Sequence, residues 1–228
     1  MNMSLMITAV VFDLDGLMFN TEEIFHGAGV ELMRRRGKEM TSEFFNLIMG
    51  RRAEEGYPLL VEAAELADDP IELWMESKQL FLDLLDQHLA PMPGLFELLD
   101  HIERSGLPKG VATSSDRPYL HRILGRFAIL ERFHMTLTAE DVTQGKPHPE
   151  IYLKAAERLG IEPREMMVLE DSHNGTKAAA AAGAHIISVP HRYSAHQDFS
   201  PARHVASSLI DPAVLELLRG SVRFGVQA

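Results

Sequence analysis

Cysteine is absent from this chain of 228 residues, so neither disulfide bonds nor thiol chemistry can contribute to its fold or function. Positive charge is scarce as well, because 22 lysines and arginines face 33 aspartates and glutamates, which gives a formal net charge of −11. Binders of nucleic acid or of anionic membranes usually carry a basic stripe, so we expect neither partner. A small phosphorylated ligand remains compatible, since a local pocket can be positive within an acidic protein.

A basic leader and a small-residue cleavage site are also missing from the N-terminal region. Its apolar stretch, residues 7–12, is short and ends at Asp13, which predicts a first β-strand and not a signal peptide or a membrane span. We therefore expect a cytoplasmic location. The chain length allows one domain with an insertion or two small domains.

Residues 20–89 contain no convincing strand pattern and predict an all-helical unit. Asn20 and Glu23 have the spacing of a capping box at the start of its first helix. Three arginines, residues 34–36, place positive charge at the C-terminus of that helix. Gly37 suits the left-handed conformation that commonly ends a helix.

A second helix of this unit is predicted to begin at Asp69-Pro70, with proline at the first helical position. Its expected apolar face contains Ile71, Trp74, Leu80, Phe81, Leu84 and Leu85.

Beyond the Pro91-Met92-Pro93-Gly94 break, helical and strand-like segments alternate. The pattern predicts strands at 110–114, 135–138, 166–169 and 185–189 and helices at 95–104, 119–127, 149–159 and 176–182. Such alternation indicates a parallel sheet with helices on both faces, and the helical unit is then an insertion after the first strand.

Chemically useful residues follow the strand-like runs of this sheet domain. They are Asp13-Leu14-Asp15-Gly16, Thr113-Ser114-Ser115, Lys146 and Glu170-Asp171. Ligands bind beyond the carboxyl ends of strands in open α/β sheets, so these residues are expected to converge there.

Together these residue types match the needs of phosphoryl transfer. One carboxylate can attack phosphorus, and a second can protonate the leaving oxygen and later activate water. A lysine, a hydroxyl group and Mg²⁺ stabilise the charge on the phosphoryl oxygens, and carboxylates at two strand ends can hold that cation.

These segments resemble the four motifs of the haloacid dehalogenase superfamily, and the insertion resembles the cap of its β-phosphoglucomutase-like, sugar-phosphatase and pseudouridine 5′-phosphatase members. The resemblance implies an α/β fold, a Rossmann-like parallel sheet core at 1–18 and 92–228 with an inserted all-helical cap domain at 19–91. It also implies a Mg²⁺-dependent phosphoric monoester hydrolase acting on a sugar phosphate or nucleoside monophosphate.

The same resemblance implies roles for the motif residues. Asp13 would become phosphorylated and Asp15 would be the general acid and base, while Thr113, the Ser114 amide and Lys146 would bind the phosphoryl group. Asp13, the Asp15 carbonyl oxygen and Asp171 would hold Mg²⁺, with Glu170 nearby and reaching the cation through water.

Two alternatives stay open. A β-phosphoglucomutase-like mutase carries a cap histidine four residues after the threonine that corresponds to Thr21. Here that position is Phe25, and His26 comes one residue later, about 100° away around a helix. A non-enzymatic receiver-like phospho-acceptor would share the acidic cluster, hydroxyl and lysine, but it lacks the insertion and a counterpart of Asp15.

Arg51 and Arg52, in the cap segment Met49-Gly50-Arg51-Arg52, are candidate contacts for the substrate's organic part or a second phosphate. His148 and His173 lie beside motif residues, and we expect them only to shape loops. The expected partner is a small phosphorylated metabolite, and the chain is expected to be a monomer or a weak homo-oligomer.

Overall fold

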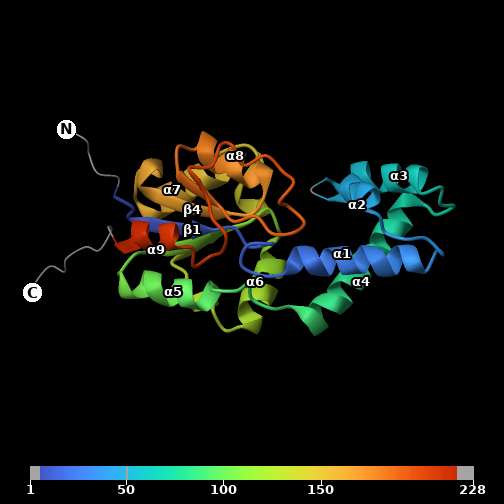
Figure 1. Cartoon of the computed structure of the whole chain (residues 1–228), viewed down its shortest axis with the longest axis horizontal. Helices are drawn as coiled ribbons and strands as arrows, with labels where there is room; N and C mark the ends of the chain where they lie inside the picture. Colours follow the sequence, from blue (N-terminus) through green and yellow to red (C-terminus); the bar gives the residue numbers. More distant parts are fainter. Residues whose placement is uncertain (1–5, 50, 220–228) are drawn as a thin grey trace, which may run out of the picture. The chain divides into compact units, whose positions relative to one another are not determined.

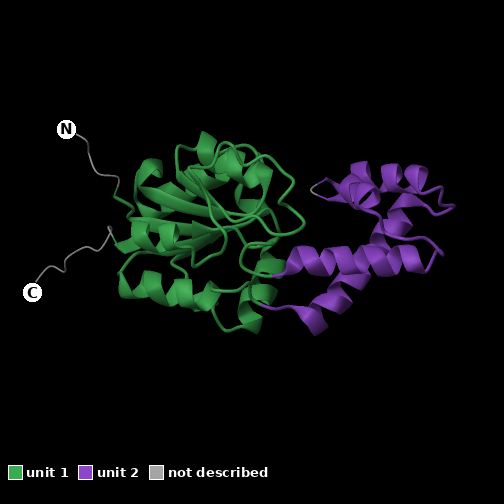
Figure 2. Cartoon of the chain, viewed as in Figure 1, with its two compact units in different colours: residues 1–19, 91–228 green, residues 20–90 purple. Residues whose placement is uncertain are grey.

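The computed structural model describes residues 6–49 and 51–219, which form two compact units. Unit 1 comprises residues 1–19 and 91–228 as far as they are described, and unit 2 comprises residues 20–90 (Figure 2). The second unit is therefore an insertion into the first. Within residues 6–49 and 51–219 no helix is long and apolar enough to cross a bilayer.

Unit 1 contains a parallel sheet of six strands in the described part of the chain, in the order β3-β2-β1-β4-β5-β6. The strands are β1 (Ala9–Phe12), β2 (Lys109–Ala112), β3 (Met135–Leu137), β4 (Met166–Glu170), β5 (His185–Ser188) and β6 (His204–Val205). Strand order reverses between β1 and β4, which makes their carboxyl ends the expected ligand position in such a fold. The predicted Rossmann-like α/β core is confirmed.

Helices cover both faces of this sheet (Figure 1). They are α5 (Leu95–Arg104), α6 (Arg117–Arg126), α7 (Glu150–Leu159), α8 (His173–Ala181) and α9 (Pro212–Arg219), with short 3₁₀ turns η1 (Leu130–Arg132), η2 (Ala139–Asp141) and η3 (Pro163–Glu165). One buried core joins the inner sides of α7 and α8 to strands β1 to β5. Ala178 and Ala179 of α8 and Ala182 at its C-terminal cap belong to this core, and their small side chains let the helix lie close to the sheet.

The predicted elements of unit 1 agree with the structure except at their ends. The strand expected at 110–114 stops at Ala112, so Thr113 and Ser114 lie in the loop that follows it. The last helix of the alternating pattern begins at His173, where the Ser172 hydroxyl accepts a hydrogen bond from Gly175 N–H. Neither β6 nor α9 was predicted. For β6 the reason is that a two-residue edge strand has no periodicity to detect.

Unit 2 is all-helical in its described residues 20–49 and 51–90, as predicted. Its helices are α1 (Thr21–Arg34), α2 (Ser42–Ile48), α3 (Ala53–Ala63) and α4 (Pro70–His88). Helix α1 packs on α4, and α3 contacts both α2 and α4. Phe25 is half-buried in this bundle, with its ring 5.6 Å from that of Phe45 and 6.2 Å from that of Phe81.

The start of α4 agrees with the sequence, since Asp69 accepts hydrogen bonds from Ile71 N–H and Glu72 N–H. Its predicted apolar face was partly wrong. Ile71 is 64% exposed and Trp74 is 38% exposed, whereas Leu73 and Ser77 are buried. The prediction failed because α4 buries only a narrow stripe, which includes Leu73 but not Ile71 or Trp74.

The capping box predicted for Asn20 and Glu23 is wrong, because Asn20 makes no side-chain cap hydrogen bond. Its amide instead joins the two ends of unit 2: Nδ2 donates to His88 O at 3.2 Å and Oδ1 accepts from Ala90 N–H at 2.8 Å. Asn20 N–H also donates to Ala90 O at 3.1 Å. A long-range contact of this kind has no signal in the local sequence.

Asp141 of η2 links three segments of unit 1 by hydrogen bonds and ion pairs. Its carboxylate accepts hydrogen bonds from Thr138 N–H and Oγ1 and from the guanidinium groups of Arg117 and Arg158, at 2.7–3.0 Å. Burial acts to raise the pKa of Asp141, but these bonds outweigh it and lower the pKa to about 2.

We expect Asp141→Asn to lower the free energy of unfolding by about 1–2 kcal/mol at pH 7. A depressed pKa stabilises the fold above the unfolded-state value of 3.8, and that stability is lost as pH falls toward 2. The difference between wild type and variant should therefore shrink below about pH 4. Urea unfolding over a pH series measures it. The exposed Glu157→Gln on α7 is the control, and an equal loss in both variants would contradict the role of Asp141.

Candidate active site

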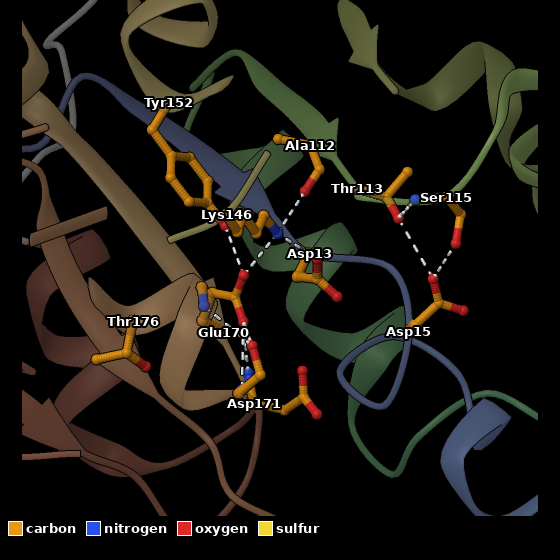
Figure 3. A network of polar contacts seen from close by, with 12 residues as sticks. Asp13, Asp15, Ala112, Thr113, Ser115, Lys146, Tyr152, Glu170, Asp171 and Thr176 are labelled. Atoms are coloured by element: carbon orange, nitrogen blue, oxygen red, sulfur yellow. Dashed lines mark hydrogen bonds and ion pairs between the residues drawn. The ribbon is translucent and has the colours of Figure 1, made fainter. Parts of the chain in front are cut away.

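The candidate site lies at the carboxyl ends of β1, β2 and β4, three adjacent strands of the sheet (Figure 3). Phe12, the last residue of β1, is in register with Leu169 of β4 and Val111 of β2. Asp13 N–H donates to Leu169 O at 3.0 Å and so extends the ladder by one residue. This register places Asp13 and Glu170 side by side at the reversal of strand order.

Lys146 reaches this point from the loop before α7. Its ammonium group donates to Asp13 Oδ1 at 2.5 Å, to Glu170 Oε1 at 2.6 Å and to Ala112 O at 3.0 Å, and its side chain is only 6% exposed. Burial acts to lower the pKa of Lys146, but the carboxylates of Asp13 and Glu170 outweigh it and raise that pKa. The lysine therefore stays charged and links the ends of three strands.

Asp13, Glu170 and Asp171 form a compact, buried carboxylate cluster. One oxygen from each lies within 4.8 Å of those from the other two. Burial raises the pKa of Asp13; Lys146 opposes that shift, while Glu170, Asp171 and Asp15 add to it. Three carboxylates around one ammonium leave an excess of negative charge, which a bound cation would neutralise.

The donor set fits a hard divalent cation, because each ligand atom it offers is a carboxylate oxygen. Asp13 and Asp171 are candidate direct ligands. Glu170 is already occupied: its Oε1 accepts from Lys146 and Tyr152, and its Oε2 accepts from Asp171 N–H, Ser172 N–H and the Ser172 hydroxyl. Such a carboxylate suits contact with the cation through water, as the resemblance implies.

The carboxylate of Asp15 points to a different set of partners. It accepts hydrogen bonds from Ser115 Oγ at 2.7 Å and Thr113 Oγ1 at 3.3 Å (Figure 3). It also accepts one from Tyr119 OH at 2.9 Å. It is not part of the carboxylate cluster found among the described residues. A metal role for Asp15 therefore rests on its backbone carbonyl oxygen and stays a prediction.

Thr113 is buried at the end of β2, and its hydroxyl also accepts from Ser115 N–H at 3.0 Å. Ser114 lies between them with an exposed side chain, so the predicted role of its backbone amide stays a prediction.

Tyr119 and Tyr152 were not among the predicted site residues. Both come from helices whose sequences indicate packing, and only the fold brings their hydroxyl groups to Asp15 and Glu170.

The two histidines beside the motifs contact backbone atoms, His148 at the start of α7 and His173 in a loop. His148 Nδ1 accepts from Glu150 N–H at 3.3 Å, and His173 Nδ1 lies 2.5 Å from Asp198 O. In unit 2, the His26 ring packs edge-on against Phe45 at 5.0 Å. Arg51 and Arg52 are exposed at the start of α3, and Gly50 of the same segment lies outside the described residues.

Gly175 of α8 provides a test of the Glu170 position. A Cβ atom there would lie 1.7 Å from Glu170 Oε1, so Gly175→Ala must displace the carboxylate from Lys146 and Tyr152. We expect a loss of about 2 kcal/mol or more in unfolding free energy, and weaker cation binding. Chemical unfolding and calorimetry measure these effects. Gly125→Ala is the matched control, because a Cβ atom there in α6 would meet nothing within 4 Å beyond its own helix, and it should be neutral or stabilising.

Residues 10–189 match the family described as haloacid dehalogenase-like hydrolase. The chain is 34% identical to a phosphorylated carbohydrates phosphatase of Thermotoga maritima, over 77% of this chain and 81% of that protein. It is 32% identical to a probable pseudouridine-5′-phosphatase of Drosophila melanogaster, over 90% of this chain and 91% of that protein.

Solved structures agree with this result. A hydrolase from Deinococcus radiodurans, with bound phosphate and sodium, has a TM-score of 0.83 at 25% identity, covering 98% of this chain and 100% of that one. A putative β-phosphoglucomutase from Thermotoga maritima has a TM-score of 0.77 at 29% identity, covering 93% and 99%. The chain belongs to the haloacid dehalogenase-like hydrolase family.

Proposed function

We propose that this protein is a Mg²⁺-dependent phosphatase that hydrolyses a small phosphorylated metabolite, a sugar phosphate or a nucleoside monophosphate, through an aspartyl-phosphate on Asp13. The observation that carries the proposal is the position of Asp13 between the Lys146 ammonium group and the carboxylates of Glu170 and Asp171. The names of the relatives, a carbohydrate phosphatase and a probable pseudouridine-5′-phosphatase, support this class of substrate.

In the first step, a carboxylate oxygen of Asp13 forms a bond to phosphorus while the ester bond to the leaving oxygen breaks. Asp15, as the carboxylic acid, donates its proton to that oxygen. In the second step Asp15, now ionised, takes a proton from water, and the water oxygen displaces Asp13 from phosphorus. Inorganic phosphate leaves, and Asp13 and Asp15 return to their initial states.

The remaining residues stabilise charge during both steps. The Lys146 ammonium group and the Thr113 hydroxyl would neutralise the peripheral phosphoryl oxygens, assisted by the Ser114 backbone amide. Asp13, Asp171 and the Asp15 carbonyl oxygen would hold Mg²⁺, with Glu170 behind them. When bound, Mg²⁺ supplies positive charge to the phosphoryl oxygens and keeps Asp13 ionised.

A phosphosugar mutase is the second candidate, and the likeness to a putative β-phosphoglucomutase favours it. A mutase must protect the aspartyl-phosphate from water while its sugar reorients. Here the cap histidine position is taken by Phe25, which packs among aromatic rings, and His26 packs against Phe45. These contacts favour the phosphatase.

We propose that the cap, residues 20–90, binds the organic part of the substrate. Arg51 and Arg52 are exposed cations there, able to bind a hydroxyl group or a second phosphate. A panel of phosphorylated metabolites, with conversion of glucose 1-phosphate to glucose 6-phosphate assayed in parallel, separates the substrates and the mutase alternative.

We expect Asp13→Asn to abolish turnover of a phosphate monoester, because an amide cannot replace the attacking carboxylate. Asp15→Asn should slow turnover by about 10²–10⁴-fold and allow phosphoenzyme to accumulate. Phosphate release and mass spectrometry of the quenched enzyme measure the two effects. Turnover of Asp13→Asn close to that of the wild type would rule out this nucleophile.

Removal of divalent metal with EDTA should abolish turnover, and added Mg²⁺ should restore it. Mg²⁺ should also raise the melting temperature, since a cation that binds only the folded state stabilises it and relieves repulsion among the three carboxylates. Thermal unfolding with and without Mg²⁺ measures this shift. Asp171→Asn should reduce it, and full activity in EDTA would contradict the metal dependence.

A further inference from the structure

His191 lies beside the carboxylate cluster but belongs to none of the motifs. It comes from the loop after β5, where its backbone carbonyl accepts hydrogen bonds from Ser194 N–H at 3.0 Å and Ala195 N–H at 2.8 Å. Its own N–H donates to the hydroxyl of the fully buried Ser194 at 3.1 Å. The imidazole is thus held on a tight, internally bonded turn.

The ring of His191 contacts the cluster directly, since Nε2 lies 2.9 Å from Asp171 Oδ2. Both side chains are largely buried, with 11% of His191 and 5% of Asp171 exposed. The other ring nitrogen, Nδ1, accepts a hydrogen bond from Tyr193 N–H at 3.2 Å. A nitrogen that accepts from a backbone N–H carries no proton, so in the neutral ring the proton is on Nε2. His191 therefore donates to Asp171.

Gly16 makes room for this hydrogen bond. A Cβ atom at position 16 would lie 2.3 Å from Asp171 Oδ2 and 2.8 Å from His191 Nε2. Gly16 also has a φ of 74°, a conformation that other residues seldom adopt. The turn after β1 therefore passes directly over the two hydrogen-bonded atoms, and a side chain there would separate them.

We propose that His191 is a positioning residue for the cation, which orients Asp171 by donating Nε2–H to its Oδ2 oxygen. The bond limits rotation of the carboxylate, so that Asp171 is oriented before the cation binds. Residues that hold a metal ligand in this way commonly contribute 10- to 100-fold to metal affinity. The inference rests on the proposed function for the cation site, and His191 itself is outside the cluster of candidate ligands.

Titration calorimetry of Mg²⁺ with the full chain tests this inference without relying on turnover. His191→Phe keeps a ring but has no N–H donor, and His191→Ala is a second variant in case the ring does not fit. We expect either variant to raise the Mg²⁺ dissociation constant by about 10- to 100-fold. His191→Gln, whose amide can still donate, should lose less affinity than either.

Two further variants make the outcome unambiguous. His196→Phe changes an exposed histidine of the same loop and should leave the dissociation constant unchanged. Asp171→Asn should abolish Mg²⁺ binding. Wild-type affinity in folded His191→Phe or His191→Ala, with binding lost in Asp171→Asn, would overturn the role of His191 and leave the cation site intact. Wild-type affinity in Asp171→Asn would instead overturn the proposed cation site.

Discussion

The buried ammonium group of Lys146 is the interaction on which the candidate site depends. It joins Asp13 after β1, the carbonyl group of Ala112 at the end of β2 and Glu170 at the end of β4. Two buried carboxylates so close together would repel strongly without a cation between them. The same contact therefore stabilises the carboxyl ends of these three strands and aligns the groups that the proposed chemistry requires.

The order of the helices and strands from β1 to β5 could be predicted because most of these strands lie in apolar runs and the breaks between elements carry glycine, proline or charge. The convergence of Asp13, Lys146, Glu170 and Asp171 was predictable as well, since parallel strands end at one edge. The roles of these residues stay proposals.

Contacts that do not follow from the common direction of the strands could not be predicted in this way. Asn20 has the sequence of a helix cap, yet its amide bonds to His88 and Ala90. Tyr119 contacts Asp15 from a helix, and His191 contacts Asp171 from a loop. The local sequence of neither element contains a signal for these contacts. Local periodicity also misplaced Ile71 and Trp74, because only the packed bundle determines which side of α4 is buried.

The closure of the insertion has a consequence for how this fold can vary. Asn20 and Ala90 are hydrogen-bonded neighbours although 70 positions separate them, and Met18 O likewise accepts from Met92 N–H at 2.9 Å. The chain thus leaves unit 1 and returns to it at adjacent points, as a short hairpin would. The entropy of closing a loop grows only slowly with its length. Segments of very different size could therefore occupy this position without disturbing the strand order, so that the insertion and the sheet beneath the candidate site can vary independently of each other.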